Sequence, residues 1–123
     1  MSAQDGKSAA AETVALAWQR VLSLEEDLLA PEIARAAYAE PRLRELFPLV
    51  SHGALTLSRC TRSPWSNDVP TLYRRAGGGY VVIRYGEGRL GEPDTVEEAV
   101  ALIVANLPAG CGAAVDGTAD DLD

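Results

Sequence analysis

The spacing of the apolar residues changes twice along this chain, and these changes constrain the fold more than any other feature of the sequence. From residue 11 to residue 47, apolar side chains recur every three or four positions, which is typical of helices with one buried face. From residue 54 to residue 85 they alternate with polar side chains, as in half-buried strands, and helical spacing then returns up to residue 107. This order predicts an α+β fold, with N-terminal helices, a three- to four-stranded antiparallel sheet and a C-terminal helix packed on the sheet.

Three helices are expected ahead of the sheet. The first runs from residue 11 to about residue 29, and its apolar stripe should place Trp18 in the core. Pro31 and Pro41 are typical of first helical turns, where amides lack partners in any case, so they begin two short helices, and Pro48 stops the second. The residues expected on the three buried faces are Val14, Trp18, Val21, Leu22, Leu28, Ile33, Ala37, Tyr38, Leu43, Leu46 and Phe47.

The expected strands occupy the middle of the chain. Residues 54–59, 71–75 and 80–85 alternate small or apolar with polar side chains, and the region around Leu90 is the candidate for a short fourth strand. The glycines at 77–79 can adopt the positive φ angles that a tight hairpin needs, so the second and third strands should pair.

The last helix has a clear start signal. Asp94 or Thr95 caps it, and Glu97 and Glu98 follow in the first turn, where the helix dipole favours carboxylates. Pro108 ends it. Its apolar stripe comprises Val96, Val100, Ile103, Val104 and Leu107.

One domain is expected, because 123 residues with 47% hydrophobic content suffice for a single core. We expect a flexible N-terminus over residues 1–10, the α+β domain over residues 11–115, and an acidic, disordered tail over residues 116–123. The start of the chain lacks the pattern of a signal peptide, and no window approaches the roughly 18 apolar residues of a membrane span, so a cytoplasmic protein is expected. Cys60 and Cys111 should therefore be reduced.

The charge balance argues against nucleic acid as a partner. Eighteen acidic and eleven basic residues give a net charge of −7, whereas affinity for phosphate backbones depends on cationic side chains. Arginines nevertheless gather in the middle of the chain, where they form either a local cationic surface or solvated strand faces. These residues are Arg59, Arg62, Arg74, Arg75, Arg84 and Arg89.

Neither metal nor cofactor chemistry is expected. One histidine and two distant cysteines do not supply the three or four ligands of a zinc site, and the glycine clusters lack the arrangement of a phosphate loop. The one catalytic triad that the residues allow combines Cys60 with His52 and Asp68. The first predicted strand would separate His52 from Cys60 by about 25 Å, so the triad requires a sharp bend.

The loop of residues 59–70 is the main candidate for a binding site. It follows the first predicted strand, is bounded by prolines, and presents a large aromatic side chain together with fixed charges. The candidate binding residues are Arg59, Cys60, Arg62, Trp65 and Asp68. The structural alternative is that Trp65 folds back over the sheet, that Arg59 pairs with Asp68, and that His52 caps a turn.

At these residues the sequence resembles an uncharacterised actinobacterial family of natural product biosynthesis proteins. The matching blocks are PRLRELFP at 41–48, SHG at 51–53, SRCT at 58–61, PWS at 64–66, DVP at 68–70, EEAVAL at 97–102 and NLP at 106–108. The resemblance implies a cytosolic protein linked to secondary metabolism. It carries over no catalytic residues.

The preferred hypothesis is an accessory binding protein of such a pathway, which uses the loop and the adjoining sheet to hold an enzyme, a peptide or a metabolite. A homodimer is a further open alternative, whereas nucleic acid and membranes are not expected partners. The rival is a small cofactor-free enzyme in which His52 or Asp68 moves a proton while Arg59 or Arg62 stabilises an anion. An acidic neutralising protein of the immunity type is a third hypothesis, which rests on small size and net charge.

Overall fold

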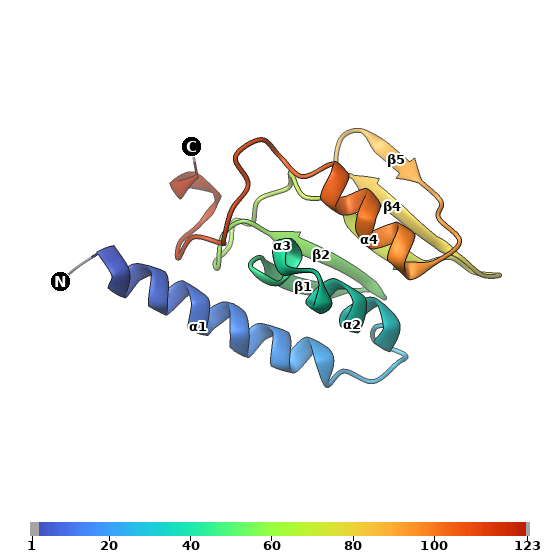
Figure 1. Cartoon of the computed structure of the whole chain (residues 1–123), viewed down its shortest axis with the longest axis horizontal. Helices are drawn as coiled ribbons and strands as arrows, with labels where there is room; N and C mark the ends of the chain where they lie inside the picture. Colours follow the sequence, from blue (N-terminus) through green and yellow to red (C-terminus); the bar gives the residue numbers. More distant parts are fainter. Residues whose placement is uncertain (1–2, 123) are drawn as a thin grey trace.

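The computed structural model describes residues 3–122, in which helices pack on one side of a five-stranded antiparallel sheet (Figure 1). The strands follow one another in the sheet in the order β1-β2-β3-β4-β5, and the α+β class is confirmed. The elements are α1 (Ala3–Leu22), α2 (Pro31–Ala39), α3 (Pro41–Arg44), β1 (Phe47–Ser51), β2 (Ala54–Ser58), β3 (Thr71–Arg74), β4 (Tyr80–Arg84), β5 (Gly88–Gly91), α4 (Val96–Ala105) and the short 3₁₀ helix η1 (Ala119–Asp121).

The sheet contains one strand more than expected, because the prediction that Phe47 ends a helix and Pro48 stops it is wrong. Both residues belong to β1, and α3 keeps only four residues. Proline removes one donor from a ladder, which a strand at the edge of a sheet tolerates, and β1 is an edge strand. The two-residue connection His52-Gly53 then pairs β1 with β2, from Ser51 opposite Ala54 onward.

The first helix also differs from its expected bounds, since it begins at Ala3 and ends at Leu22. The Ser23 hydroxyl donates to the Gln19 carbonyl at 2.8 Å, which satisfies one of the last carbonyls of α1. Leu28 then lies in a turn and is 50% exposed, so its expected place on the buried stripe is wrong. Residues 1, 2 and 123, which belong to the two expected flexible ends, lie outside the described residues.

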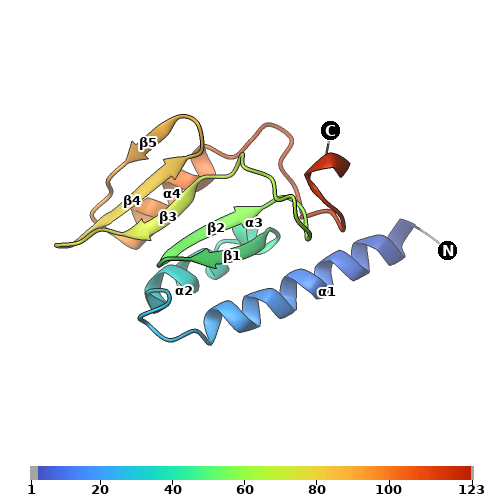
Figure 2. The same ribbon diagram turned by 180° about the vertical axis from the view of Figure 1, so that it is seen from behind.

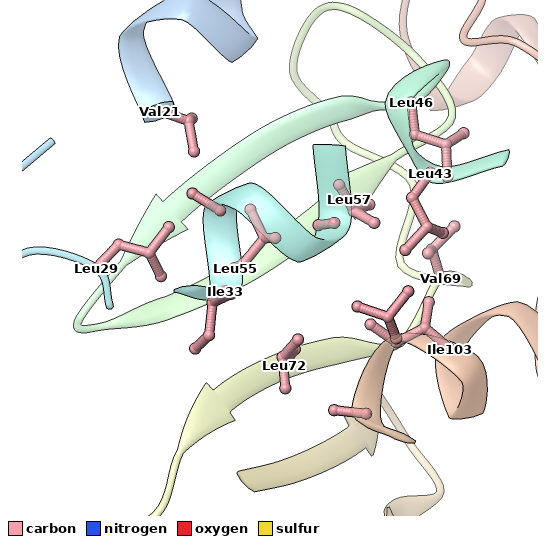
Figure 3. Close-up of a cluster of buried hydrophobic side chains, with 14 of the residues drawn as sticks. Val21, Leu29, Ile33, Leu43, Leu46, Leu55, Leu57, Val69, Leu72 and Ile103 are labelled. Carbon is pink, nitrogen blue, oxygen red and sulfur yellow. The ribbon is translucent and has the colours of Figure 1, made fainter. Parts of the chain in front are cut away.

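One core fills the space between the helices and the inner face of the sheet (Figure 3). The expectation that Trp18 is buried is confirmed: its side chain is 1% exposed, and its indole N–H donates to the Leu46 carbonyl at 3.0 Å. Thr95 caps α4 as expected, with its hydroxyl accepting from the Glu98 amide. Other members of the core include Val21, Leu29, Ile33, Leu43, Leu55, Leu57, Leu72, Val82 and Ile103.

The other side of the sheet carries no helix within the described chain (Figure 2). The register identifies its residues, because directly opposed side chains of paired strands point to the same side. Leu49 faces Thr56, whose hydroxyl lies 3.0 Å from that of Thr71, and Thr71 in turn faces Ile83. We call this surface the bare face; its half-buried residues are Phe47, Leu49, Ala54, Thr56, Thr71, Tyr73 and Ile83.

Within residues 3–122, no helix combines the length and the hydrophobicity needed to cross a membrane.

Candidate binding site

Residues 59–70 form the connection from β2 to β3, and we call this connection the Trp65 loop. Trp65 is half-buried and stacks on Phe47 of β1, with the ring centroids 5.2 Å apart and the planes inclined by 10°. Phe47 shares the side of the sheet that bears Leu49, so the stacked pair lies at one end of the bare face. Trp65 therefore extends the aromatic and apolar surface of that face, whereas Val69 of the same loop is buried in the core.

An ion pair fixes the two ends of the loop to each other. The Arg59 guanidinium donates to one oxygen of Asp68 through Nε at 3.0 Å and through Nη2 at 2.5 Å. The Arg59 side chain is 18% exposed and that of Asp68 40%. Burial raises the pKa of Asp68, but the hydrogen bonds and charge of Arg59 outweigh this effect and hold that pKa below its usual value.

The segment that follows α4 holds the loop from the other side. Thr61 N–H donates to the Val115 carbonyl at 3.1 Å, and Arg62 N–H donates to the Gly117 carbonyl at 2.8 Å. The buried Thr61 hydroxyl accepts from Gly117 N–H and donates to the carboxylate of Asp116. These bonds place residues 116 and 117, for which the sequence predicts a disordered tail, against the loop.

Cys60 contributes to the architecture of the loop. It is fully buried, and it forms a parallel bridge with Val115. The Ser58 hydroxyl accepts from the Cys60 amide and from the Ser66 amide, each at 3.2 Å, which closes the start of the loop over β2. Cys60 and Cys111 are both free thiols.

His52 lies at the opposite end of β2 from the Trp65 loop. It is exposed in the tight turn between β1 and β2 and has a φ of 52°, the left-handed conformation that such two-residue turns require. Seven residues of extended chain separate it from Arg59, which corresponds to about 23 Å at the rise of a strand. Since Asp68 pairs with Arg59, the structure does not bring His52 and Asp68 together, and Cys60 lies farther still along the same direction.

The far end of the bare face carries an excess of positive charge. Arg75 and Arg89 both form ion pairs with Glu92, which leaves one positive charge in this group of three. At the loop end, the exposed Arg62 forms no ion pair with a side chain of residues 9–122. The acidic C-terminal segment lies close to this end as well, since Ala119 N–H donates to the Pro64 carbonyl at 2.8 Å, so the excess of positive charge is at the far end.

A hollow of about 910 Å³, which the sequence did not reveal, lies between the middle of α1 and the segment after α4. Val14, Ala15 and Trp18 of α1 form one wall, and the other residues that line it include Tyr38, Glu45 and Asp116. The signal for it was present in the run of alanines that precedes Trp18, because small side chains on an interior stripe leave space. No three His, Cys, Asp or Glu side chains in the part of the chain that the structure describes gather as a metal site.

Comparison with known families identifies a match over residues 12–118 to DUF6193, a family of unknown function. The chain belongs to the DUF6193 family. No curated protein and no solved structure matches it. In this DUF6193 protein the matched region includes β1 to β5 with their bare face, the whole Trp65 loop, and residues 115–117, which bind the loop.

Proposed function

We propose that this protein is an accessory binding protein of a bacterial natural-product pathway, which holds a partner protein on the bare face and the Trp65 loop. The link to the pathway rests on the resemblance of the blocks around His52, Cys60 and Trp65. The observation that carries the proposal is the bare face itself, a sheet surface of half-buried apolar, aromatic and threonine side chains on which no helix of the described chain packs (Figure 2).

The shape of the surface favours a protein over a metabolite. Small molecules bind in concave sites that enclose most of their surface, whereas the bare face is one side of a sheet with its residues in rows across the strands. Aromatic residues at such a surface are the usual anchors of protein interfaces, and Trp65 stacked on Phe47 provides one.

The border of the surface favours an acidic partner. At the far end of the bare face, the two guanidinium groups beside Glu92 exceed its single negative charge. Complementary charges at the rim of an interface raise the association rate and select the partner. A protein with an apolar patch bordered by carboxylates fits both features of the bare face.

The same geometry supports binding over acid–base catalysis. A general acid and base must reach one reacting group, which requires hydrogen-bond distances of about 3 Å. His52 and Asp68 lie at opposite ends of β2, and Asp68 is already engaged by Arg59. The Arg59 charge is therefore compensated within the loop rather than directed at a substrate anion.

The experiment measures calorimetric binding to the purified proteins encoded by the genes adjacent to this one. Leu49→Asp places a carboxylate in the middle of the bare face, and we expect it to weaken binding at least tenfold because an unpaired charge must then be desolvated. Trp65→Ala should weaken binding as well. Both variants should keep the melting temperature close to that of the unchanged protein, since neither residue belongs to the core cluster.

The matched control is Leu16→Asp, the same change at a leucine of α1 that is 55% exposed and does not belong to the bare face. The proposal fails if Leu49→Asp and Leu16→Asp bind the partner equally well. Sedimentation provides a second criterion, because a second copy of the chain is the competing occupant. A homodimer that Leu49→Asp dissociates would assign the bare face to self-association and overturn the proposal.

A further inference from the structure

The hollow beside α1 is separate from the bare face and has the construction of a small-molecule site. Its volume of about 910 Å³ lies within the range of roughly 300–1,000 Å³ that ligand pockets occupy. Tyr38 and Val115, each 37% exposed, supply an apolar surface, and the buried Trp18 lies beneath it with its ring in edge-to-face contact with Tyr38 at 5.5 Å. Ala15 leaves open space in front of that surface, because it has no side chain beyond Cβ.

Several of its walls are fixed before any ligand arrives. The indole of Trp18 is held by its hydrogen bond to the Leu46 carbonyl, and the guanidinium of Arg44 lies over the Tyr38 ring at 5.4 Å. Asp116 accepts a hydrogen bond from the buried Thr61 at 3.0 Å. A site whose walls are held in this way loses little conformational entropy when a ligand binds.

The charges around the hollow are unequal. Among residues 9–122, Glu45 and Asp116 contribute two carboxylates to its lining, whereas Arg44 contributes one positive charge that is already directed at Tyr38. Both carboxylates are exposed, so they border the opening rather than the interior. The chain carries a net charge of −7, which attracts cations to such a site and repels anions.

From this combination we infer that the hollow binds a small apolar molecule that carries one amine. The apolar part packs against Tyr38 and Val115, and the ammonium group lies at the opening beside Glu45 and Asp116. This site is independent of the bare face, so a protein partner and the amine can be tested separately.

The test compares three probes with the same naphthalene ring: 2-(1-naphthyl)ethylamine, 2-(1-naphthyl)ethanol and 1-naphthylacetate. Binding is followed by tryptophan fluorescence in a Trp65→Phe background, where Trp18 is the one tryptophan left. We expect the amine to bind on the order of ten times more tightly than the carboxylate, since each exposed ion pair contributes a factor of a few. Glu45→Gln combined with Asp116→Asn should reduce this preference at least threefold.

Two further variants separate the hollow from nonspecific attraction to an acidic protein. Ala15→Phe fills the space in front of Trp18 and should abolish amine binding in calorimetry. Leu16→Phe adds an aromatic ring at the next, exposed position of the same helix and should leave it unchanged. The inference is overturned if the carboxylate binds as tightly as the amine, if none of the probes binds, or if Ala15→Phe binds the amine like the unchanged protein.

Discussion

The contact between Thr61 and the segment after α4 gives a sharp test of the structure. Thr61→Val keeps the shape of the side chain but removes the hydroxyl, which accepts from Gly117 N–H at 3.1 Å and donates to Asp116 at 3.0 Å. Gly117 is buried, so its amide loses its acceptor without gaining water. That loss costs about 1–3 kcal/mol, whereas the exposed Asp116 carboxylate returns to solvent and adds little.

We therefore expect Thr61→Val to lower the free energy of unfolding by about 2 kcal/mol, measured by urea denaturation. For a domain of this size the melting temperature should fall by about 8 °C. Amide hydrogen exchange should become faster at Arg62 and Gly117, which lie on the two sides of the broken contact.

The matched control is Thr56→Val, which also removes a threonine hydroxyl from a hydrogen bond at 3.0 Å. Thr56 lies on the half-exposed bare face and satisfies no buried amide, so the change should stay within about 0.5 kcal/mol. Equal, small effects of the two substitutions would refute the reasoning. The segment would then be a frayed tail, as its acidic composition predicts.

Three further predictions concern single residues. His52→Asn should stabilise the folded state by about 0.5 kcal/mol and raise the melting temperature by about 1–3 °C, because asparagine tolerates the positive φ of this turn. His52→Val should lower the melting temperature, because a β-branched residue does not tolerate that φ. Thr95→Ala should cost about 1 kcal/mol in urea denaturation, since it removes the cap of α4. The lowered pKa of Asp68 stabilises the folded state above its usual pKa of about 4, and this contribution is lost as the pH falls through the folded value. The stability difference between the unchanged protein and Asp68→Asn should therefore shrink between pH 6 and pH 3 in acid titrations.

The sequence predicted the elements whose apolar pattern extends over many residues, and the turns that are marked by glycine or by a capping residue. The strand around Leu90 and the hairpin at 77–79 are both present, and Thr95 caps the last helix as expected. The strand β1 was not predicted, because proline is compatible both with the end of a helix and with an edge strand. The position of Pro48 in the sheet, which the sequence does not give, decides between these two roles.

Alternation also indicated which side chains share a side of the sheet, but it did not reveal that one side has no cover. The half-buried row of Thr56, Thr71 and Ile83 has the same alternating pattern in sequence whether or not another layer packs on it. The distinction depends on where the helices lie. In this fold the helices that reach the sheet join a single core on the inner face.

The Trp65 loop and the acidic end of the chain were predicted to be separate, one a binding loop and the other a disordered tail. They are adjacent, because the amides of residues 61 and 62 donate to the carbonyls of residues 115 and 117. Such contacts join single backbone groups more than fifty positions apart and leave no periodic trace in the sequence. The same bonds hold Asp116 at the opening of the hollow, so the hollow escaped prediction for the same reason. The sequence shows the alanines, aromatic rings and carboxylates that line the hollow. The contacts that bring these residues together exist only in the folded chain.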